Sequence, residues 1–350
     1  MQYEVDYIPV GTGEKGGDAI VFRYGDFSDL TKQYVVVIDG GTKDSGKLLV
    51  EHIKQYYGTT YVDLVVASHL HNDHISGLTE VLENMTVAKI AVHCPWDYTQ
   101  AIKRMTNTES SISGLQSKLE KSLSGLSTLV DLAESKKIPI IQPFQGEKIL
   151  DGLYVLGPSK AYYQQLLANF GVTPEVKEEH RIDKIISVAK EAATWIAEAL
   201  HIETLTDDYP DTDSENNSSL VLLFVCDGKK FLFTGDAGKD ALGKVIEYTN
   251  SINFDLSGLD FFDVPHHGSK RNLSPTILNK LKPKQAFISC PPQGDPKHPS
   301  RKVVNALLRR GSAVHTNKNK LTLCHPSANV PARQGWGPAT PESFYNQVEE

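Results

Sequence analysis

A strand that runs directly into a histidine-rich loop is the feature that most constrains this chain. The apolar run 62–68 is followed at once by His69-Leu-His71-Asn-Asp73-His74. In an extended connector alternate side chains point the same way, so His69 and His71 can face one position. The neighbouring Asp73 and His74 can then face a second position. Imidazole and carboxylate groups bind zinc, manganese or iron, and four of them in one loop suit two ions better than one. The loop therefore predicts a metal site, with a solvent-exposed polar loop as the alternative.

The chain has the size and composition of a globular protein. Its 350 residues, of which 40% are hydrophobic, suffice for one large domain or two ordinary ones. No run approaches the ~18 consecutive apolar residues that a membrane helix needs, and the first residues lack the regions of a secretion signal. We therefore expect a cytoplasmic protein without membrane contact. The four cysteines have no paired spacing, which favours buried free thiols over disulfides or metal ligands.

The charge is distributed unevenly. The net charge of −7 argues against nonspecific binding to nucleic acid. Residues 265–320, however, contain twelve lysines or arginines and one acid, Asp295, so this segment carries +11 and the rest of the chain −18. Such asymmetry predicts a polyanionic ligand. The alternative is that several of these cations lie on the solvated face of a helix at 301–310.

The hydrophobic periodicity predicts alternating strands and helices. The expected strands are 3–9, 18–23, 34–38, 62–68, 87–93, 138–142, 153–156, 220–226, 230–233, 261–265 and 285–290. The expected helices are 46–57, 101–135, 175–200 and 300–310. A core-facing stripe is predicted by leucines at positions 115, 119, 123, 126, 129 and 132. We expect one domain over 1–325 with a helical insertion at about 100–210, and an extended tail over 326–350, where proline and glycine are frequent.

Further polar residues follow other predicted strands. Asp236 comes after an apolar strand, with Gly235 allowing the backbone to turn. It is a candidate to bridge two ions, and the alternative is a turn residue or a helix cap. His266 and His267 follow the strand at 261–265, and we interpret them as one ligand and one catalytic residue.

Three more side chains near this histidine pair suit an anionic substrate. Ser269 and Lys270 can hold a phosphate oxygen, as hydroxyls and cations do. His298 stands just before a helix start at Ser300 and is expected to contact the substrate. An exposed loop position is the alternative for His298.

Together these motifs resemble the metallo-β-lactamase superfamily and, within it, the soluble hydrolase domain of ComEC-type DNA-uptake proteins. In chain order the matching motifs are Asp18-Ala-Ile-Val, Val37-Ile-Asp39-Gly-Gly41, Ser68-His69 to Gly77-Leu78, Asn217-Ser-Ser-Leu-Val-Leu222, Phe233-Thr-Gly-Asp236, Val264-Pro-His266-His267-Gly-Ser269 and His298-Pro299. The resemblance implies an α/β fold, the αβ/βα sandwich of two mixed sheets flanked by helices. It also implies hydrolysis, commonly of phosphodiesters.

The resemblance also implies roles by position. His69 and His71 would hold one ion. The second ion would be held by Asp73, His74 and His266. No convincing third histidine for the first ion lies between residues 77 and 231, where the candidates are His93, His180 and His201.

Four further roles follow from the same resemblance. Asp236 would bridge the two ions. Asp39 would accept a hydrogen bond from a ligating imidazole and so orient it. His267 and His298 would touch the substrate or its leaving group.

The leading hypothesis is a dinuclear phosphodiesterase or nuclease with zinc or manganese. Ion-bound hydroxide would attack phosphorus while the ions and Lys270 neutralise the oxyanions. His267 or His298 would protonate the departing oxygen, and Asp73 would be both ligand and catalytic residue. One alternative is hydrolysis of a carboxylic ester, lactone or thioester on the same ions. Another is a non-catalytic subunit whose helical insertion contacts a protein partner or a second copy.

Overall fold

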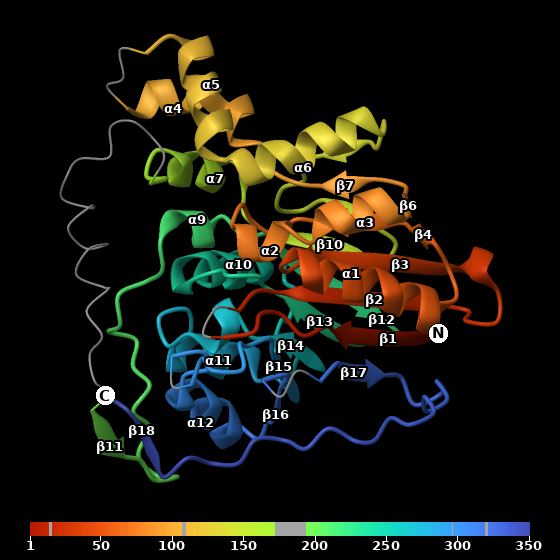
Figure 1. Ribbon diagram of the computed structural model, residues 1–350. Helices are drawn as coiled ribbons and strands as arrows, with labels where there is room; N and C mark the ends of the chain where they lie inside the picture. Colours follow the sequence, from red (N-terminus) through yellow and green to blue (C-terminus); the bar gives the residue numbers. More distant parts are fainter. Residues whose placement is uncertain (14–15, 107–109, 172–193, 296, 319–320) are drawn as a thin grey trace.

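Two seven-stranded mixed sheets form the centre of the protein (Figure 1). The computed structural model describes residues 1–13, 16–106, 110–171, 194–295, 297–318 and 321–350. Across the first sheet the strands are β17 (Leu323–Pro326), β1 (Gln2–Tyr7), β2 (Ala19–Gly25), β3 (Gln33–Gly40), β5 (Leu64–Val66), β7 (Ile90–Ala91) and β8 (Ile140–Ile141). Across the second they are β16 (Ala313–Thr316), β15 (Gln285–Ile288), β14 (Phe261–Asp263), β13 (Lys229–Phe233), β12 (Val221–Cys226), β10 (Leu153–Gly157) and β9 (Lys148–Leu150). Smaller pairs join β4 (Tyr61–Val62) to β6 (Thr86–Val87) and β11 (Trp195–Ala197) to β18 (Gln347–Glu349).

The two sheets pack face to face through aromatic side chains. Phe22 of β2 stacks on Phe233 of β13 with ring centroids 5.3 Å apart, and Tyr24 packs on Phe224 at 4.7 Å. Successive strand residues face opposite sides, so Val21, between Ile20 and Phe22, belongs to the other core, beneath the helices. Burial of both faces explains why the strands read as nearly continuous apolar runs.

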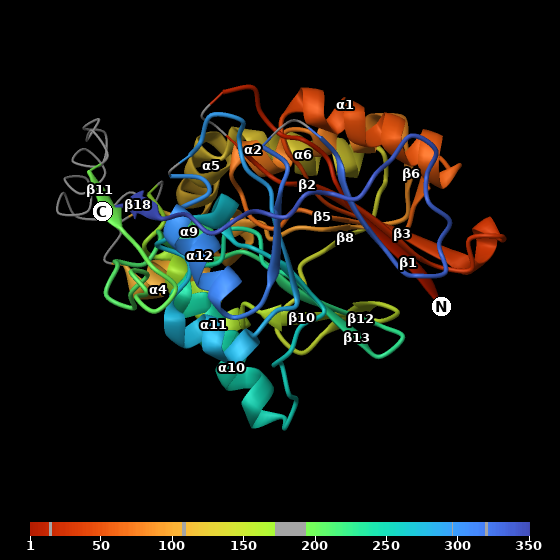
Figure 2. The ribbon, with the colours of Figure 1, turned by 90° about the horizontal axis from the view of Figure 1, so that it is seen from below.

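Helices cover the outer face of each sheet. Figure 2 shows α1 and α6 above the first sheet and α10 and α11 below the second. The helices are η1 (Leu30–Lys32), α1 (Lys43–His52), η2 (Ile53–Tyr57), α2 (Asn72–Ile75), α3 (Leu78–Asn84), η3 (Pro95–Tyr98), α4 (Thr99–Met105), α5 (Ile112–Ser122), α6 (Ser124–Ser135), α7 (Lys160–Leu167), α9 (Ser214–Asn217), α10 (Lys239–Ser251), η4 (His266–Gly268), α11 (Pro275–Leu281) and α12 (Arg301–Arg309). These layers confirm the predicted αβ/βα sandwich of two mixed sheets flanked by helices.

The expected long helix at 101–135 is divided into α4, α5 and α6. A new helix starts at α5 because Ser111 caps it, accepting a hydrogen bond from the backbone of Gly114 at 3.0 Å. Five of the six leucines in the predicted stripe are buried and Leu132 is half-buried. Strands β8, β9 and β10 also fall within 100–210 and belong to the two main sheets. The longer helices among the described residues of this stretch are α4, α5, α6 and α7.

The expected helix at 175–200 lies mostly outside the described residues. At its described end the helical prediction is wrong, because β11 is a strand that pairs with β18. Pairing with a segment about 150 residues away gives a short apolar run its hydrogen bonds, and no local pattern reports such a partner.

Arg333 anchors the C-terminal segment 326–350 to the first strand. Its guanidinium donates to the two oxygens of Asp6 at 2.9 and 2.7 Å and pairs with Glu4 at 2.9 Å. Glu4 and Asp6 are fully buried, so their charges depend on these partners. The segment predicted as an extended tail is thus held on the core by a buried ionic network.

Asp6 gives the stability of the protein a dependence on acid pH. Burial would raise the pKa of Asp6, but the hydrogen bonds and charges of His52 and Arg333 lower it from 3.8 to about 2. A carboxyl with a lowered folded pKa stabilises above its usual pKa and loses that contribution as the pH falls through the folded pKa. Between pH 4 and pH 2, roughly, we expect the free energy of unfolding to fall more steeply for the parent than for Asp6→Asn. Urea denaturation at each pH measures the free energy of unfolding of both proteins. If the two free energies fall in parallel with pH, Asp6 is not the source of the pH dependence.

The four cysteines are free thiols, as predicted, and Cys94, Cys226 and Cys290 are buried. Across the described part of the chain, no helix has the length and apolarity that crossing a membrane requires.

Candidate metal centre

The predicted site residues meet where strands of both sheets end. Strand β3 ends just after Asp39 and β5 just before the histidine-rich loop, while β13 and β14 end just before Asp236 and the histidine pair. Strands β3 and β5 run parallel, as do β13 and β14, so their carboxyl ends share an edge. Gly235 has a φ of 51°, and a side chain there would approach Ser68 Oγ to 2.8 Å. The loops of the two sheets therefore touch.

Hydrogen bonds fix the tautomers of His69 and His74. The hydroxyl of Ser68 donates to Asp39 Oδ2 at 2.6 Å, so it accepts from Nδ1–H of His69 at 3.0 Å. His74 Nδ1 lies 2.8 Å from Asp39 Oδ2, an acceptor, so Nδ1 carries the hydrogen. Both rings thus keep a lone pair on Nε2. These atoms face Asp236, at 3.6 Å from Oδ2 for His69 and 3.3 Å from Oδ1 for His74.

The histidine pair is fixed in the same way. His266 Nδ1 lies 3.0 Å from Oδ1 of Asn272, whose amide nitrogen donates to the backbone oxygen of Asp236 at 2.8 Å. Nδ1 of His266 is therefore the donor, and its Nε2 lone pair faces Asp236 Oδ2 at 3.6 Å. His267 Nδ1 lies 3.0 Å from the backbone oxygen of Ser289, which can only accept, so Nε2 of His267 is also free.

Several overlapping sets of candidate ligand atoms lie here, and two of them together contain most of the predicted ligands. Each of these two groups has its members within 4.8 Å of one another: His69, His71 and Asp236 in one, and Asp73, His74 and His267 in the other. Asp236 and His267 also form a set with Asp18, and His69 and His74 form one with Asp39. Three buried atoms here have no hydrogen-bond partner, namely His74 Nε2, Asp236 Oδ1 and His267 Nε2. Buried polar atoms are rarely left unpaired, and a cation between these lone pairs satisfies all three. The donor set therefore fits divalent metal ions.

The carboxylates of the site also favour a positive charge. Burial acts to lower the pKa of His267, but the charges of Asp236 and Asp18 outweigh it and raise the pKa to about 9. For His74 burial acts in the same direction, yet Asp236 and Asp39 raise the pKa well above its usual value. A divalent cation supplies the positive charge that protons on these rings would otherwise supply, and its binding releases those protons.

Asp18 lies at the site, although no role was predicted for it. Its carboxylate is buried and lies 3.5 Å from His267 Nδ1 and 3.8 Å from His74 Nδ1. The preceding Gly17 allows this approach, because a side chain there would lie 1.9 Å from the backbone oxygen of Asp73. The only signal in the sequence was the presence of Asp18-Ala-Ile-Val among the shared motifs.

The structure differs from the predicted arrangement at the histidine pair. His267, rather than His266, lies with Asp73 and His74, whereas His266 faces the other oxygen of Asp236. The backbone of η4 explains the difference: both histidines have positive φ, 50° and 55°, and their ring planes lie 74° apart. The turn thus directs two adjacent rings to opposite sides of one carboxylate.

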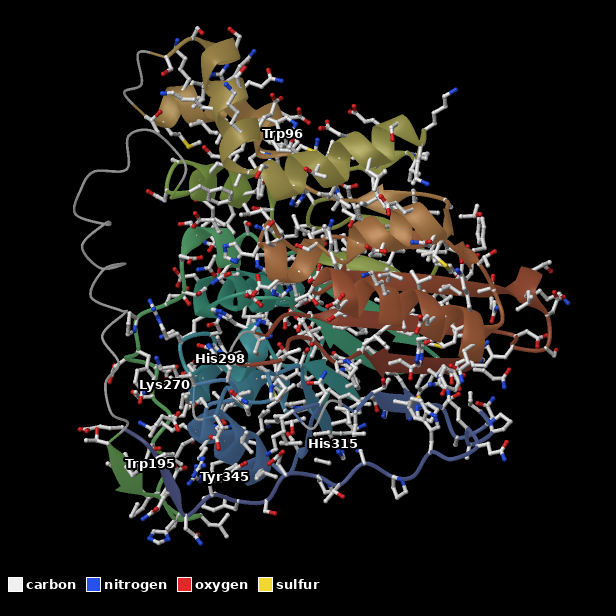
Figure 3. All side chains as sticks on the ribbon, viewed as in Figure 1. Trp96, Trp195, Lys270, His298, His315 and Tyr345 are labelled. Atoms are coloured by element: carbon white, nitrogen blue, oxygen red, sulfur yellow. The ribbon has the colours of Figure 1, made fainter. Side chains whose placement is uncertain are left out.

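The predicted substrate contacts His298 and Lys270, both labelled in Figure 3, have different surroundings, because His298 contacts the histidine pair and Lys270 contacts the C-terminal segment. His298 Nδ1 lies 3.2 Å from the backbone oxygen of His266, and burial together with the nearby histidines lowers its pKa to about 3. Lys270 Nζ donates to the backbone oxygen of Glu350 at 2.6 Å and lies over the ring of Tyr209. The Lys270 ammonium thus contacts the C-terminal segment rather than the candidate ligands.

Most cations of the basic segment 265–320 contact the chain itself. Arg309 pairs with Glu198 at 2.5 Å and Arg310 with Glu203 at 2.7 Å. The cations of this segment that form ion pairs or hydrogen bonds within the chain are Lys270, Arg271, Lys284, Arg301, Lys302, Arg309, Arg310 and Lys318. The charge asymmetry therefore has an internal explanation, because these side chains mostly hold residues 195–211 and 342–350 in place.

The two described histidines that were also considered for the first ion, His93 and His201, lie away from the candidate groups. His93 Nε2 is 2.8 Å from the backbone oxygen of Pro143, and its ring stacks on Phe144. His201 is exposed, and His180 lies outside the described residues. His93 therefore has a packing role.

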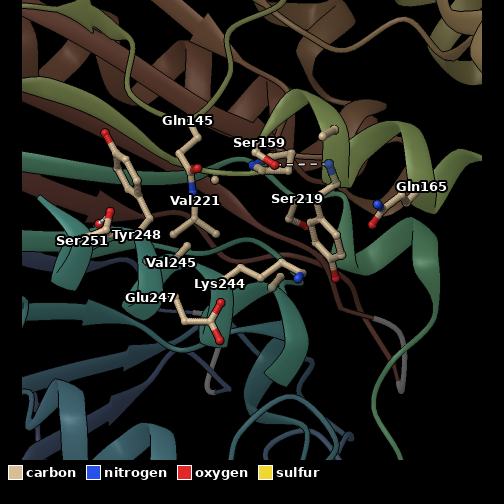
Figure 4. A pocket seen from close by; sticks show the side chains of 15 residues that line it. Gln145, Ser159, Gln165, Ser219, Val221, Lys244, Val245, Glu247, Tyr248 and Ser251 are labelled. Carbon is tan, nitrogen blue, oxygen red and sulfur yellow. Dashed lines mark hydrogen bonds between the residues drawn. The ribbon is translucent and has the colours of Figure 1, made fainter.

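A cavity of about 430 Å³ borders Ser219, which holds the backbone of Asp236 (Figure 4). Ser159, Gln165, Lys244 and Ser219 are among its lining residues. The hydroxyl of Ser219 accepts the backbone N–H of Asp236 at 3.1 Å. None of the candidate ligand side chains lines this cavity.

Comparison with known proteins agrees with the motifs. Residues 16–107 match the family model described as Metallo-beta-lactamase superfamily. ComE operon protein 3 of Bacillus subtilis is 30% identical over 167 residues, which make up 45% of this chain and 20% of that protein. Recombination protein 2 of Haemophilus influenzae is 35% identical over 123 residues, 34% of this chain and 14% of that protein. The chain thus spans a small part of the length of these relatives.

Several solved structures are also similar. A diphosphatase from the PhnP family covers 83% of this chain and 86% of its own, with 13% identity and a TM-score of 0.37. An archaeal metallo-β-lactamase superfamily protein from Sulfolobus tokodaii covers 79% and 84%, with 19% identity and a TM-score of 0.30. The match over residues 16–107 and the two curated relatives confirm that the chain resembles the metallo-β-lactamase superfamily and, within it, the ComEC-type proteins.

Proposed function

We propose that the protein is a hydrolase that uses two divalent ions, zinc or manganese, to cleave a phosphodiester. The observation that carries the proposal is the convergence of three Nε2 lone pairs, of His69, His74 and His266, on the carboxylate of Asp236. Three buried atoms there, His74 Nε2, Asp236 Oδ1 and His267 Nε2, have no hydrogen-bond partner. When bound, two such ions activate a water molecule and neutralise charge on the oxygens of the group under attack.

The proposed ligand set divides the adjacent histidines between the two ions. The first ion would be held by His69, His71 and His266, the second would be held by Asp73, His74 and His267, and Asp236 would be a ligand shared by both. His266 thus supplies the third imidazole that the sequence lacks between residues 77 and 231. Asp39 and Asn272 would orient His74 and His266, as outer partners of ligating imidazoles do.

The substrate would approach from the side of His71, Asp73 and His266, which are partly exposed, while the other ligands are buried. His298 donates its Nδ1–H to the backbone of His266, so its Nε2 remains an acceptor. We therefore assign His298 the role of accepting a hydrogen from water or from a substrate hydroxyl, in place of protonating the leaving oxygen.

The phosphodiester class rests on the motif resemblance, and both nucleic acid and a small diester fit it. The test offers the purified protein, with manganese or zinc, bis-para-nitrophenyl phosphate, single- and double-stranded DNA, RNA and a lactone. Cleavage of one phosphodiester substrate that a chelator abolishes supports the proposal. Cleavage of the lactone alone, or of nothing while two ions are bound, would refute it.

Exchange of single histidines should separate the two ions. We expect His266→Ala to weaken binding of one ion and His267→Ala to weaken binding of the other. Each affinity should fall by at least about 10–100-fold, because changing a residue that only hydrogen-bonds to a metal ligand already causes a loss of that size. Elemental analysis gives the stoichiometry, and the absorption of bound cobalt distinguishes the two environments. The exposed His201→Ala is the control. If His266→Ala and His267→Ala alter the same cobalt signal, the proposed division of ligands is wrong.

A further inference from the structure

We propose that Glu349 is a positioning residue that sets His298 against the histidine pair. Glu349 lies in β18, about 80 residues beyond His267, and touches none of the proposed ligands. The effect on catalysis rests on the proposed function. The positioning itself rests on a continuous set of contacts from β18 to the histidine pair.

Glu349 supplies the N-terminal cap of helix α12. Its buried carboxylate accepts the hydroxyl hydrogen of Ser300 through Oε1 and the backbone N–H of Arg301 through Oε2, the latter at 3.2 Å. Ser300 occupies the cap position but makes no capping hydrogen bond of its own. A residue 49 positions away therefore performs the task that the cap side chain usually performs. A carboxylate at this end of a helix is also stabilised by the helix dipole.

The capped residue is tied directly to the histidine loop. The backbone N–H of Ser300 donates to the backbone oxygen of Gly268 at 2.9 Å. A side chain on Gly268 would lie 2.9 Å from Cβ of Pro299, so the two loops pack without spare room. Between them His298 donates to the backbone of His266, and the two rings lie 5.4 Å apart. A shift of Ser300 would thus move His298 relative to its neighbour.

The pairing of β11 with β18 keeps Glu349 in place. Residues 195–197 pair with 347–349, and Arg309 of α12 binds Glu198 next to β11. Lys270, just after the histidine pair, donates to the backbone oxygen of Glu350. Figure 1 shows both strands beside α12, at the end of the molecule where the C-terminus lies. The paired strands β11 and β18 therefore contact both the loop of the histidine pair and the start of α12.

The test compares Glu349→Ala, Glu349→Gln and the control Gln347→Ala, an exposed change on the same strand. For bis-para-nitrophenyl phosphate we expect Glu349→Ala to lower kcat by about 10–100-fold with KM and metal content unchanged. Glu349→Gln keeps an acceptor oxygen and should regain most of the rate. The control should match the parent.

A second measurement does not depend on turnover. In protein labelled with ¹⁵N-histidine, the imidazole nitrogens of His298, assigned with His298→Ala, should shift in Glu349→Ala and stay in Gln347→Ala. If Glu349→Ala does not fold, Glu349→Asp, with its carboxylate withdrawn by one methylene, should show the same shift. Unmoved His298 signals, or a fall in kcat that only follows loss of metal, would overturn the inference. If neither the parent protein nor any variant cleaves a diester, the proposed function is wrong. The His298 signals still show in that case whether Glu349 positions His298.

Discussion

Replacing Asp236 by asparagine should remove metal binding and hydrolysis together. Asp236 contacts both candidate groups, with Oδ1 facing His74 and Oδ2 facing His69 and His266. An amide presents one acceptor oxygen and no charge, so at least one ion loses its anionic ligand. We expect kcat to fall by at least about 10²–10³-fold, the loss caused by removing one preorganised electrostatic group.

Metal content and rate should be measured on the same preparation of Asp236→Asn. The matched control is Asp240→Asn, a carboxylate four residues away in the first turn of α10. Circular dichroism separates loss of metal from loss of fold. A variant that keeps two ions and the rate of the parent would show that Asp236 is a turn residue, the alternative that its sequence position also allows.

Arg333→Ala should destabilise the protein by about 3 kcal/mol, because it leaves buried carboxylates with fewer partners. Glu4 would retain Arg23, and Asp6 would retain His52 and Tyr57. Removing one partner from a buried ionic network costs more than the network contributes when intact, since the remaining charge stays desolvated.

Urea denaturation of Arg333→Ala gives the change in free energy of unfolding, with the neighbouring exposed Gln334→Ala as control. Metal content should stay that of the parent, because Arg333 contacts β1 and not the site. An effect as small as that of Gln334→Ala would mean that Glu4 and Asp6 are satisfied without Arg333.

The sequence predicted most of the site because the chemistry is concentrated at strand ends. The loop at His69–His74, Asp236 and the pair His266 and His267 each follow an apolar run, and the structure brings them together. Strand positions in both sheets were also predictable, since burial on both faces leaves long apolar runs.

What the sequence could not predict depends on backbone conformation and on distant partners. The positive φ at both His266 and His267 decides which ring faces which oxygen, and the motif Pro-His-His-Gly does not report it. Asp18 reaches the site only because Gly17 packs on Asp73. The basic segment appeared free because the groups that engage it, at residues 195–211 and 342–350, are remote in the chain.

Strand β1 has β2 on one side and β17 on the other, and β17 is formed by residues 323–326. During synthesis the second edge of β1 therefore stays unpaired, because its partner strand is synthesised more than 300 residues later. An unpaired strand edge is a template for contact between chains, so nascent copies of this protein are exposed to mutual association until β17 emerges. Expression at low temperature, or with a chaperone that covers such edges, should therefore raise the yield of folded protein.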